Sequence, residues 1–206
     1  MSFSEEKIES LKERVRSVLS PRRFLHTLGV EAAAVKISGF CLPEATDELR
    51  AAALLHDVTK ELSVLEQAAI MQLAGLSISD FPAPAVHHSV TAPTVILRDF
   101  PEYATKNVLS AVYNHTTAAP DMSLFDEILF VADYVEDGRT YSACVAVRES
   151  LYEAFVNASN SEECVAHLHC ATLAALDNTI AEIARTGKLL DERTVAARNA
   201  FLERQP

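Results

Sequence analysis

A helical period of apolar residues runs through nearly the whole chain. Residues 4–19 place their apolar side chains on one stripe and their charges on the opposite face, which is the pattern of an amphipathic helix. The run AAALL at residues 51–55 is among the best helix-forming stretches of the sequence. No convincing period of two and no hairpin turn signal interrupts this pattern. We therefore predict an all-α fold.

Cap signals divide the chain into successive helices. Capping-box patterns, in which a serine precedes an acidic residue by three positions, start helices at residues 63–66 and 123–126. The sequence contains no internal repeat, low-complexity tract or linker. We predict a single domain over residues 1–206, with the core helices at 15–140 and further C-terminal helices at 141–206.

The charge balance restricts what the protein can bind. Its 18 Lys and Arg residues are outnumbered by 29 Asp and Glu residues, which gives a formal charge of −11. Sequence-independent binding to duplex nucleic acid or to anionic membranes needs basic surfaces, so we expect neither partner. Only 5 glycines are present, and no glycine-rich phosphate-binding motif occurs. A protein of this kind that binds phosphate must do so by other means.

The sequence also predicts a cytoplasmic location. Its first residues are charged and lack the apolar core of a secretory signal, and no run approaches the ~18 apolar residues that span a bilayer. The 4 cysteines do not have the spacing of a disulfide framework. We expect them to be free thiols.

Histidine and aspartate residues gather at or near the ends of apolar helical segments. His56 and Asp57 follow the AAALL run, where both side chains can reach one ion placed over the helix end. A polar helix end would explain this pair alone as well. Asp133 carries more weight, because a carboxylate within the apolar segment FVADYV must be paired or bound to a metal. The histidines in comparable positions are His26, His87, His88 and His115.

The types of donor indicate the kind of metal. Imidazoles and carboxylates without cysteine suit Fe, Mn, Co, Mg or a catalytic Zn rather than a closed thiolate site. The segment CVAHLHC also combines cysteine and histidine. In a continuous helix, however, Cys164, His167 and Cys170 would fan over ~120°, which is too wide for one tetrahedral site. We interpret that segment as structural.

The order of the candidate ligands resembles that of a known family. His26, then His56-Asp57, then Asp133 is the pattern of the HD superfamily of metal-dependent phosphohydrolases. The chain most resembles the YqeK-type HD domains, which are similar to bacterial symmetrical diadenosine tetraphosphate hydrolases. The segments that carry the resemblance are RFLHTLGV, AALLHDVTKEL, VHHSVTAP, YNHTTAAPDMSLFDEILFVADYVEDGR and LDNTIAEIARTGKLLDERTVAARN, within residues 15–203. It implies an HD-domain helical bundle with a C-terminal helical extension.

The resemblance implies a site for two divalent metal ions, with Asp57 bridging them. The implied ligands are His26, His56, Asp57 and Asp133 for the first ion, and His87 and His115 for the second. In the tandem pair either His87 or His88 could be the ligand, and alignment on Val90 favours His87. Iron is the expected metal, with Mn, Co, Mg and Zn as alternatives.

Polar residues near these ligands are candidates for catalysis and for binding phosphate or nucleoside. The predicted catalytic residues are His56, Asp57 and Lys60. The predicted substrate-binding residues are Lys60, Arg139, Arg23, Thr116, Thr117 and Asn178. The cations would donate charge-assisted hydrogen bonds to phosphate oxygens. Plainer interpretations stay open: Lys60 and Arg23 could face solvent, the threonines could cap a helix, and Asn178 could bridge helices.

These residues predict the hydrolysis of a small phosphorylated substrate. The residue pattern alone supports metal-dependent hydrolysis of a phosphoester or phosphoanhydride. The resemblance implies that diadenosine tetraphosphate is cut to two ADP by a water activated between two metals. The alternatives are an HD phosphohydrolase of nucleoside mono- or triphosphates, and a nucleotide-binding regulatory module with little turnover. The expected partner is a small nucleotide, and the apolar first helix could also pack in a homodimer.

Overall fold

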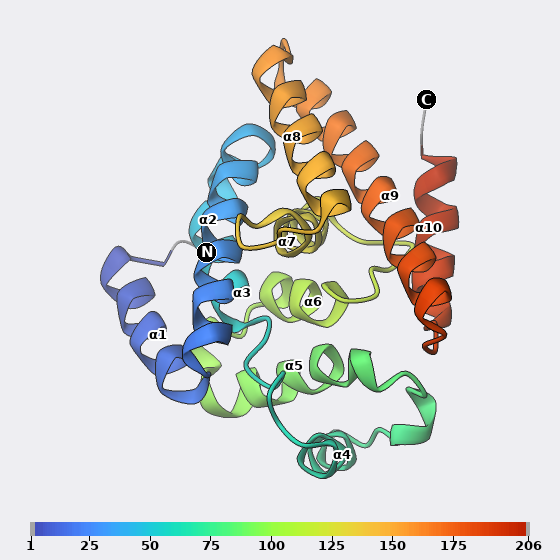
Figure 1. Cartoon of the computed structure of the whole chain (residues 1–206). Coiled ribbons are helices and arrows are strands. Elements are labelled where there is room, and N and C mark those ends of the chain that lie inside the picture. The colour runs from blue at the N-terminus through green and yellow to red at the C-terminus, as the bar shows by residue number, and fades with distance from the viewer. Residues whose placement is uncertain (1–2, 205–206) are drawn as a thin grey trace.

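The computed structural model describes residues 3–204 of the chain, which over this range is helical and has no strand (Figure 1). The α-helices are α1 (Glu5–Val18), α2 (Pro21–Cys41), α3 (Thr46–Leu55), α4 (Val64–Leu73), α5 (His87–Asp99), α6 (Lys106–Asn114), α7 (Leu124–Val135), α8 (Ser142–Asn157), α9 (Ser161–Thr186) and α10 (Glu192–Glu203). The short 3-10 helices are η1 (Pro43–Ala45), η2 (Ile78–Asp80), η3 (Pro84–Val86) and η4 (Pro101–Tyr103). The prediction of an all-α fold is confirmed. Within the described range, no helix is both long enough and apolar enough to cross a lipid bilayer.

Helix α7 forms the centre of the molecule. Figure 1 shows it nearly end-on, with α2, α6, α8 and α9 around it, and it packs against each of them. Its residues from Phe125 to Ala132 are all buried, as expected for a helix that is apolar on almost every side. The predicted capping box is present at its start. The Ser123 hydroxyl accepts a hydrogen bond from the Asp126 N–H at 3.2 Å, and the Asp126 carboxylate accepts one from the Ser123 N–H at 2.9 Å.

Helices α2 and α3 pack against each other beside α7. In α3, residues 51–55 are all buried, which agrees with their apolar sequence. The helix ends at Leu55, so His56 and Asp57 begin the turn that follows it. Both of these polar residues are buried, with 0% and 2% of their surface exposed. The end of an apolar helix thus delivers an imidazole and a carboxylate into the interior.

The C-terminal helices share the core with the rest of the molecule. Helix α9 packs against α7, α8 and α10, and Figure 1 shows it running along one side of the structure. A buried polar contact ties α9 to α7, because Glu127 accepts hydrogen bonds from His169 Nδ1 at 2.8 Å and from Thr172 Oγ1 at 2.7 Å. One hydrophobic cluster extends from Phe3 to Phe201. The division of the chain near residue 140 stays a prediction.

Candidate metal centre

Histidine and aspartate side chains from five segments of the chain converge beside α7. They are His26 of α2, His56 and Asp57 after α3, His88 of α5, His115 after α6, and Asp133 of α7. They form overlapping groups of three, and within each group the candidate ligand atoms all lie within 4.8 Å of one another. All the predicted ligands except His87 are in this cluster.

The two carboxylate oxygens of Asp57 face different histidines. Oδ2 lies 3.7 Å from His26 Nε2 and 3.4 Å from His56 Nε2. Oδ1 lies 3.4 Å from His88 Nε2 and 3.7 Å from His115 Nε2. Asp57 therefore stands between two groups of imidazoles, which is an arrangement suited to a carboxylate shared by two metal ions.

Backbone carbonyls fix the orientation of two of these rings. His56 Nδ1 lies 2.6 Å from the Ala53 carbonyl oxygen, and His115 Nδ1 lies 2.6 Å from that of Val112. Because a carbonyl oxygen can only accept, Nδ1 must carry the proton in both rings. In the neutral form, Nε2 then presents its lone pair to the cluster, as a metal-binding histidine requires.

His26 is held in a different way, by the buried carboxylate of Glu136 just after α7. His26 Nδ1 lies 3.1 Å from Glu136 Oε1, and Glu136 Oε2 accepts a hydrogen bond from the Gly138 N–H at 2.6 Å. Glycines leave room for this carboxylate: a Cβ at residue 138 would lie 2.9 Å from Oε2, and one at Gly29 would overlap with the same atom. We did not predict a role for Glu136, although a glutamate between an apolar helix and a glycine was a signal for one.

The donor set fits a divalent metal ion. His26 Nε2 and His56 Nε2 are buried and have no hydrogen-bond partner among the described residues, which is unfavourable for polar atoms. These nitrogens and the carboxylates of Asp57 and Asp133 present lone pairs to the same small volume. A cation in that volume would satisfy them together. Imidazole and carboxylate donors of this kind suit several divalent ions, iron among them.

Most of these groups are held in the protonation state that a metal ligand needs. Burial raises the pKa of Asp57, but attraction by His56 and its neighbours outweighs burial and holds the pKa well below its usual range. Burial also raises the pKa of Asp133, but Arg139, His26 and His56 together outweigh it and hold the pKa well below its usual range. Burial lowers the pKa of His115, which favours its neutral form. In contrast, the pKa of His56 is raised, because the attraction of Asp57 overcomes burial.

The structure corrects the prediction that His87 is a ligand. His88 is the member of the tandem pair that lies in the cluster, with its Nε2 3.1 Å from His115 Nε2. The His87 ring is turned away, and its Nε2 donates to the Phe81 carbonyl oxygen at 2.7 Å. Adjacent residues of a helix point about 100° apart, so only one of the two rings can face the cluster. Alignment on Val90 selected the wrong one.

Three cationic side chains line a cavity of about 290 Å³ beside the cluster. Arg23 Nη1 donates to Asp57 Oδ2 at 2.8 Å, and Arg139 Nη2 donates to Asp133 Oδ1 at 2.6 Å. Lys60 also lines the cavity, where it forms no ion pair with a described carboxylate, and burial lowers its pKa. The structure thus brings these three predicted substrate-binding residues together. We call this space the inner cavity.

Only one of the two adjacent threonines lines the inner cavity. Thr116 does so, and its Oγ1 lies 2.9 Å from His88 Nε2. Thr117 is buried, and its hydroxyl donates to the Ala118 carbonyl oxygen at 3.0 Å. The prediction that Thr117 binds substrate is therefore corrected, because its hydroxyl is used inside the protein.

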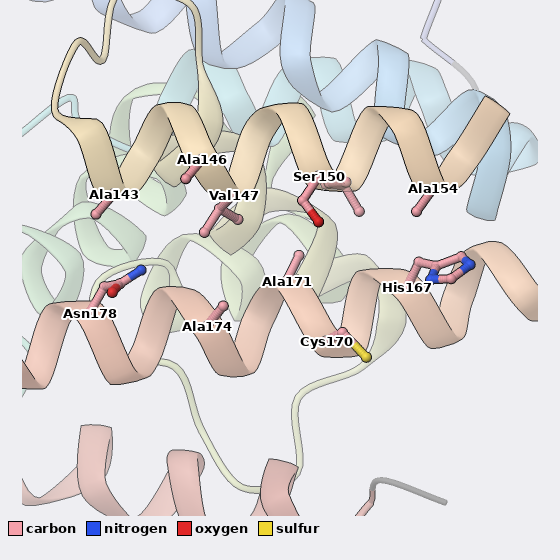
Figure 2. Close-up of a pocket in the computed structure, with 11 residues that line it drawn as sticks. Ala143, Ala146, Val147, Ser150, Ala154, His167, Cys170, Ala171, Ala174 and Asn178 are labelled. Carbon is pink, nitrogen blue, oxygen red and sulfur yellow. The ribbon is translucent and has the colours of Figure 1, made fainter. Parts of the chain in front are cut away.

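The structure also corrects the prediction that Asn178 lines the substrate site. Figure 2 shows Asn178 on α9 in a groove facing α8, in line with Ala174. The next residue, Thr179, lines the inner cavity instead, since neighbours on a helix diverge by about 100°. Asn178 itself is not among the residues that line the inner cavity. Phe130 and Tyr134 also line the inner cavity, and neither of them was predicted from the sequence.

The CVAHLHC segment of α9 is separate from the cluster. Cys164 is buried and Cys170 is exposed, so the two thiols face different surroundings. Figure 2 shows His167 and Cys170 along the groove that contains Asn178. No group of potential metal ligands among the described residues includes any residue of this segment. This arrangement agrees with its structural interpretation.

Comparisons with known proteins match this geometry. The family model described as HD domain matches residues 23–138, a range that contains every residue of the cluster. The symmetrical bis(5'-nucleosyl)-tetraphosphatase of Staphylococcus aureus is 27% identical over 147 residues, which cover 70% of this chain and 74% of that protein. A protein of the same name from Halalkalibacterium halodurans is 27% identical over 195 residues, or 93% of this chain and 95% of that protein. A crystal structure from Clostridium acetobutylicum, described as a predicted HD superfamily hydrolase involved in NAD metabolism, matches over 100% of both chains with a TM-score of 0.81 and 28% identity.

Proposed function

This chain belongs to the HD domain family, and from that premise we propose that it is a metal-dependent hydrolase that converts diadenosine tetraphosphate to two ADP. The observation that carries the proposal is a histidine and aspartate cluster that fits metal ions, next to a cavity lined by three cations. The substrate is supported by relatives named symmetrical bis(5'-nucleosyl)-tetraphosphatase, one of which matches 93% of the chain.

We propose that two divalent ions bind in the cluster and share Asp57. The residues that would hold them are His26, His56, Asp57 and Asp133 for one ion, and Asp57, His88 and His115 for the other. When bound, these ions would supply Lewis acidity, which lowers the pKa of a water molecule and withdraws charge from phosphate oxygens. Iron is the metal that we expect, with Mn, Co, Mg and Zn as alternatives.

The cations of the inner cavity would bind and orient the polyphosphate. Lys60 Nζ lies 3.1 Å from His88 Nε2 on the wall of this cavity and forms no ion pair with a described carboxylate, so no partner neutralises its charge. Arg23 and Arg139 are each anchored on an aspartate of the cluster, so the remaining N–H groups of their guanidinium forks can point to a phosphate. Their charges would stabilise the negative charge that develops on the leaving phosphate. Thr116 would add a hydroxyl donor on the same wall.

Symmetrical cleavage would follow from how the substrate lies across this site. Addition of one water molecule to an inner phosphorus, with breakage of its P–O bond to the central bridging oxygen, yields two ADP. The inner cavity, at about 290 Å³, is at the small end of the volumes of ligand sites. We propose that it takes one half of the substrate while the other half leaves.

The test is turnover by the purified full chain supplied with Mn, Co or Fe. Diadenosine tetraphosphate is incubated with the protein, and the nucleotides are separated by chromatography. Two equivalents of ADP are expected, and chelator-treated protein is the control. AMP with ATP would contradict symmetrical cleavage, and turnover of nucleoside mono- or triphosphates alone would assign another substrate. Nucleotide binding without any product would indicate a regulatory module.

A further inference from the structure

A second and larger cavity adjoins the inner cavity. It has a volume of about 840 Å³ and lies between the start of α2 and the loop 136–141 that links α7 to α8. We call it the outer groove. Arg23 and Arg139 line both spaces, so the two cavities share these residues as part of their walls. The outer groove is therefore next to the inner cavity, across this pair of arginines.

The acidic residues of the outer groove are engaged with the protein itself or point into solvent. Glu61 accepts hydrogen bonds from the Ser20 N–H at 2.8 Å and from the Ser20 hydroxyl at 2.6 Å. Glu136 faces inward as the support of the metal cluster. The side chain of Asp137 is 95% exposed and lies 3.6 Å from Arg148. These carboxylates leave the groove open to an anionic ligand.

Two further residues of the outer groove are suited to a nucleotide. Arg22 is exposed, and its side chain forms no ion pair or hydrogen bond with another described residue, so its charge is available to a ligand. Tyr141, at the end of the loop before α8, is 74% exposed. An exposed aromatic ring offers a face on which a base can stack, and a guanidinium binds phosphate through its fork of donors.

We propose that the outer groove binds the second nucleotide of the substrate, with its base stacked on Tyr141 and a phosphate bound by Arg22. The inference rests on the proposed function, because it takes the substrate to be a dinucleoside polyphosphate. The polyphosphate would pass between Arg23 and Arg139, which are at the junction of the two spaces. The outer groove has the larger volume, which leaves room for a nucleoside with its phosphates.

The experiment compares two ligands that differ only in the second nucleoside. The full chain loaded with Mn²⁺ is titrated calorimetrically with adenosine tetraphosphate and with diadenosine tetraphosphate, each with a methylene group in place of the oxygen between its second and third phosphorus atoms, so that neither can be cleaved there. We expect Tyr141→Ala to lower the affinity for the dinucleoside about tenfold, as the loss of one stacked base does. The affinity for adenosine tetraphosphate should stay within about twofold of that of the wild type. Tyr141→Phe keeps the ring and should bind both ligands as the wild type does.

Arginine variants test the other half of the site. Arg22→Ala should lower the affinity for the dinucleoside more than the affinity for adenosine tetraphosphate. Because alanine is well tolerated in the first turns of α2, we expect this variant to fold. Arg185→Ala removes an exposed arginine at the end of α9 and should change neither affinity. The proposal is overturned if the wild type binds the two ligands with equal affinity. It is also overturned if Tyr141→Ala lowers the affinity for both ligands by the same factor, or leaves both affinities unchanged.

The results also test the binding role of the outer groove separately from the proposed hydrolysis. A selective loss of dinucleoside binding in Tyr141→Ala, together with no ADP formed from the cleavable substrate, would support the groove and reject hydrolysis. Formation of two ADP by a Tyr141→Ala variant with wild-type affinity for the dinucleoside would reject the groove and support hydrolysis.

Discussion

The carboxylate of Glu136 supports the imidazole of His26 from the side opposite to the metal cluster, with 3.1 Å between Glu136 Oε1 and His26 Nδ1. Because the Glu136 oxygen accepts this hydrogen bond, the ring proton is on Nδ1, and Nε2 is left to face the cluster. There Nε2 lies 3.1 Å from Asp133 Oδ1. Carboxylates in this position orient a histidine and make it a better metal ligand.

We expect Glu136→Ala to weaken metal binding although it removes no ligand. Loss of a supporting carboxylate of this kind lowers metal affinity by about 10–100-fold. Competition between the protein and a chelator for Mn²⁺ measures the affinity directly. Glu182→Ala, which removes an exposed carboxylate of α9, is the control. Equal affinities of Glu136→Ala and the wild type would contradict the supporting role.

Two glycine substitutions in α2 should have opposite effects on the free energy of unfolding. Alanine is favoured over glycine inside a helix by about 1 kcal/mol, and at Gly39 the added Cβ meets nothing within 4 Å. At Gly29 the added Cβ would overlap with the Glu136 carboxylate. We expect urea denaturation to show that Gly39→Ala is more stable than the wild type and Gly29→Ala less stable. A stabilised Gly29→Ala would mean that Glu136 does not pack against α2 as described.

Glutamine substitutions should separate the roles of His87 and His88. His88→Gln removes a proposed ligand, so we expect less metal per chain and a loss of turnover of at least about 100-fold, more than for a supporting residue. His87→Gln keeps a donor for the Phe81 carbonyl and should retain the metal. Elemental analysis of protein prepared without chelator gives the metal content. A larger loss in His87→Gln than in His88→Gln would restore the assignment made from the sequence.

Metal removal should lower the thermal stability of the protein. A ligand that binds only the folded state at about 100 times its Kd stabilises that state by about 2.7 kcal/mol, so adding Mn²⁺ to chelator-treated protein should raise the Tm. Asp57→Asn removes the charge shared by both proposed metal positions and should show a smaller rise and no hydrolysis. Circular dichroism checks that this variant keeps its helices. An unchanged rise in Tm would place the metal elsewhere.

Features that depend on neighbours in the sequence were predictable. The capping boxes at Ser63 and Ser123 are formed as predicted, because both partners of each box lie within one helical turn. The unusual place of Asp133 in an apolar segment also indicated a polar cluster, since a buried carboxylate needs partners.

Features that depend on how helices rotate against one another were not predictable in this way. In place of His87 and Asn178, the structure brings the adjacent residues His88 and Thr179 to the site. The spacing along a helix sets the angle between neighbours, but the packing of α5 and α9 on the other helices decides which neighbour faces inward. Glu136 was missed for a similar reason, because its partner His26 is 110 residues away.

Thr179 of α9 is part of the wall of the inner cavity and lies outside residues 23–138, the range that the HD domain model matches. The whole histidine and aspartate cluster lies inside that range. The proposed metal ligands and one part of the cavity wall are thus encoded in separate stretches of the gene. Mutations in the C-terminal helices can reshape this cavity while the proposed metal ligands stay intact. Related proteins can therefore evolve to accept other nucleotides through substitutions in these helices, with no change to the proposed metal ligands.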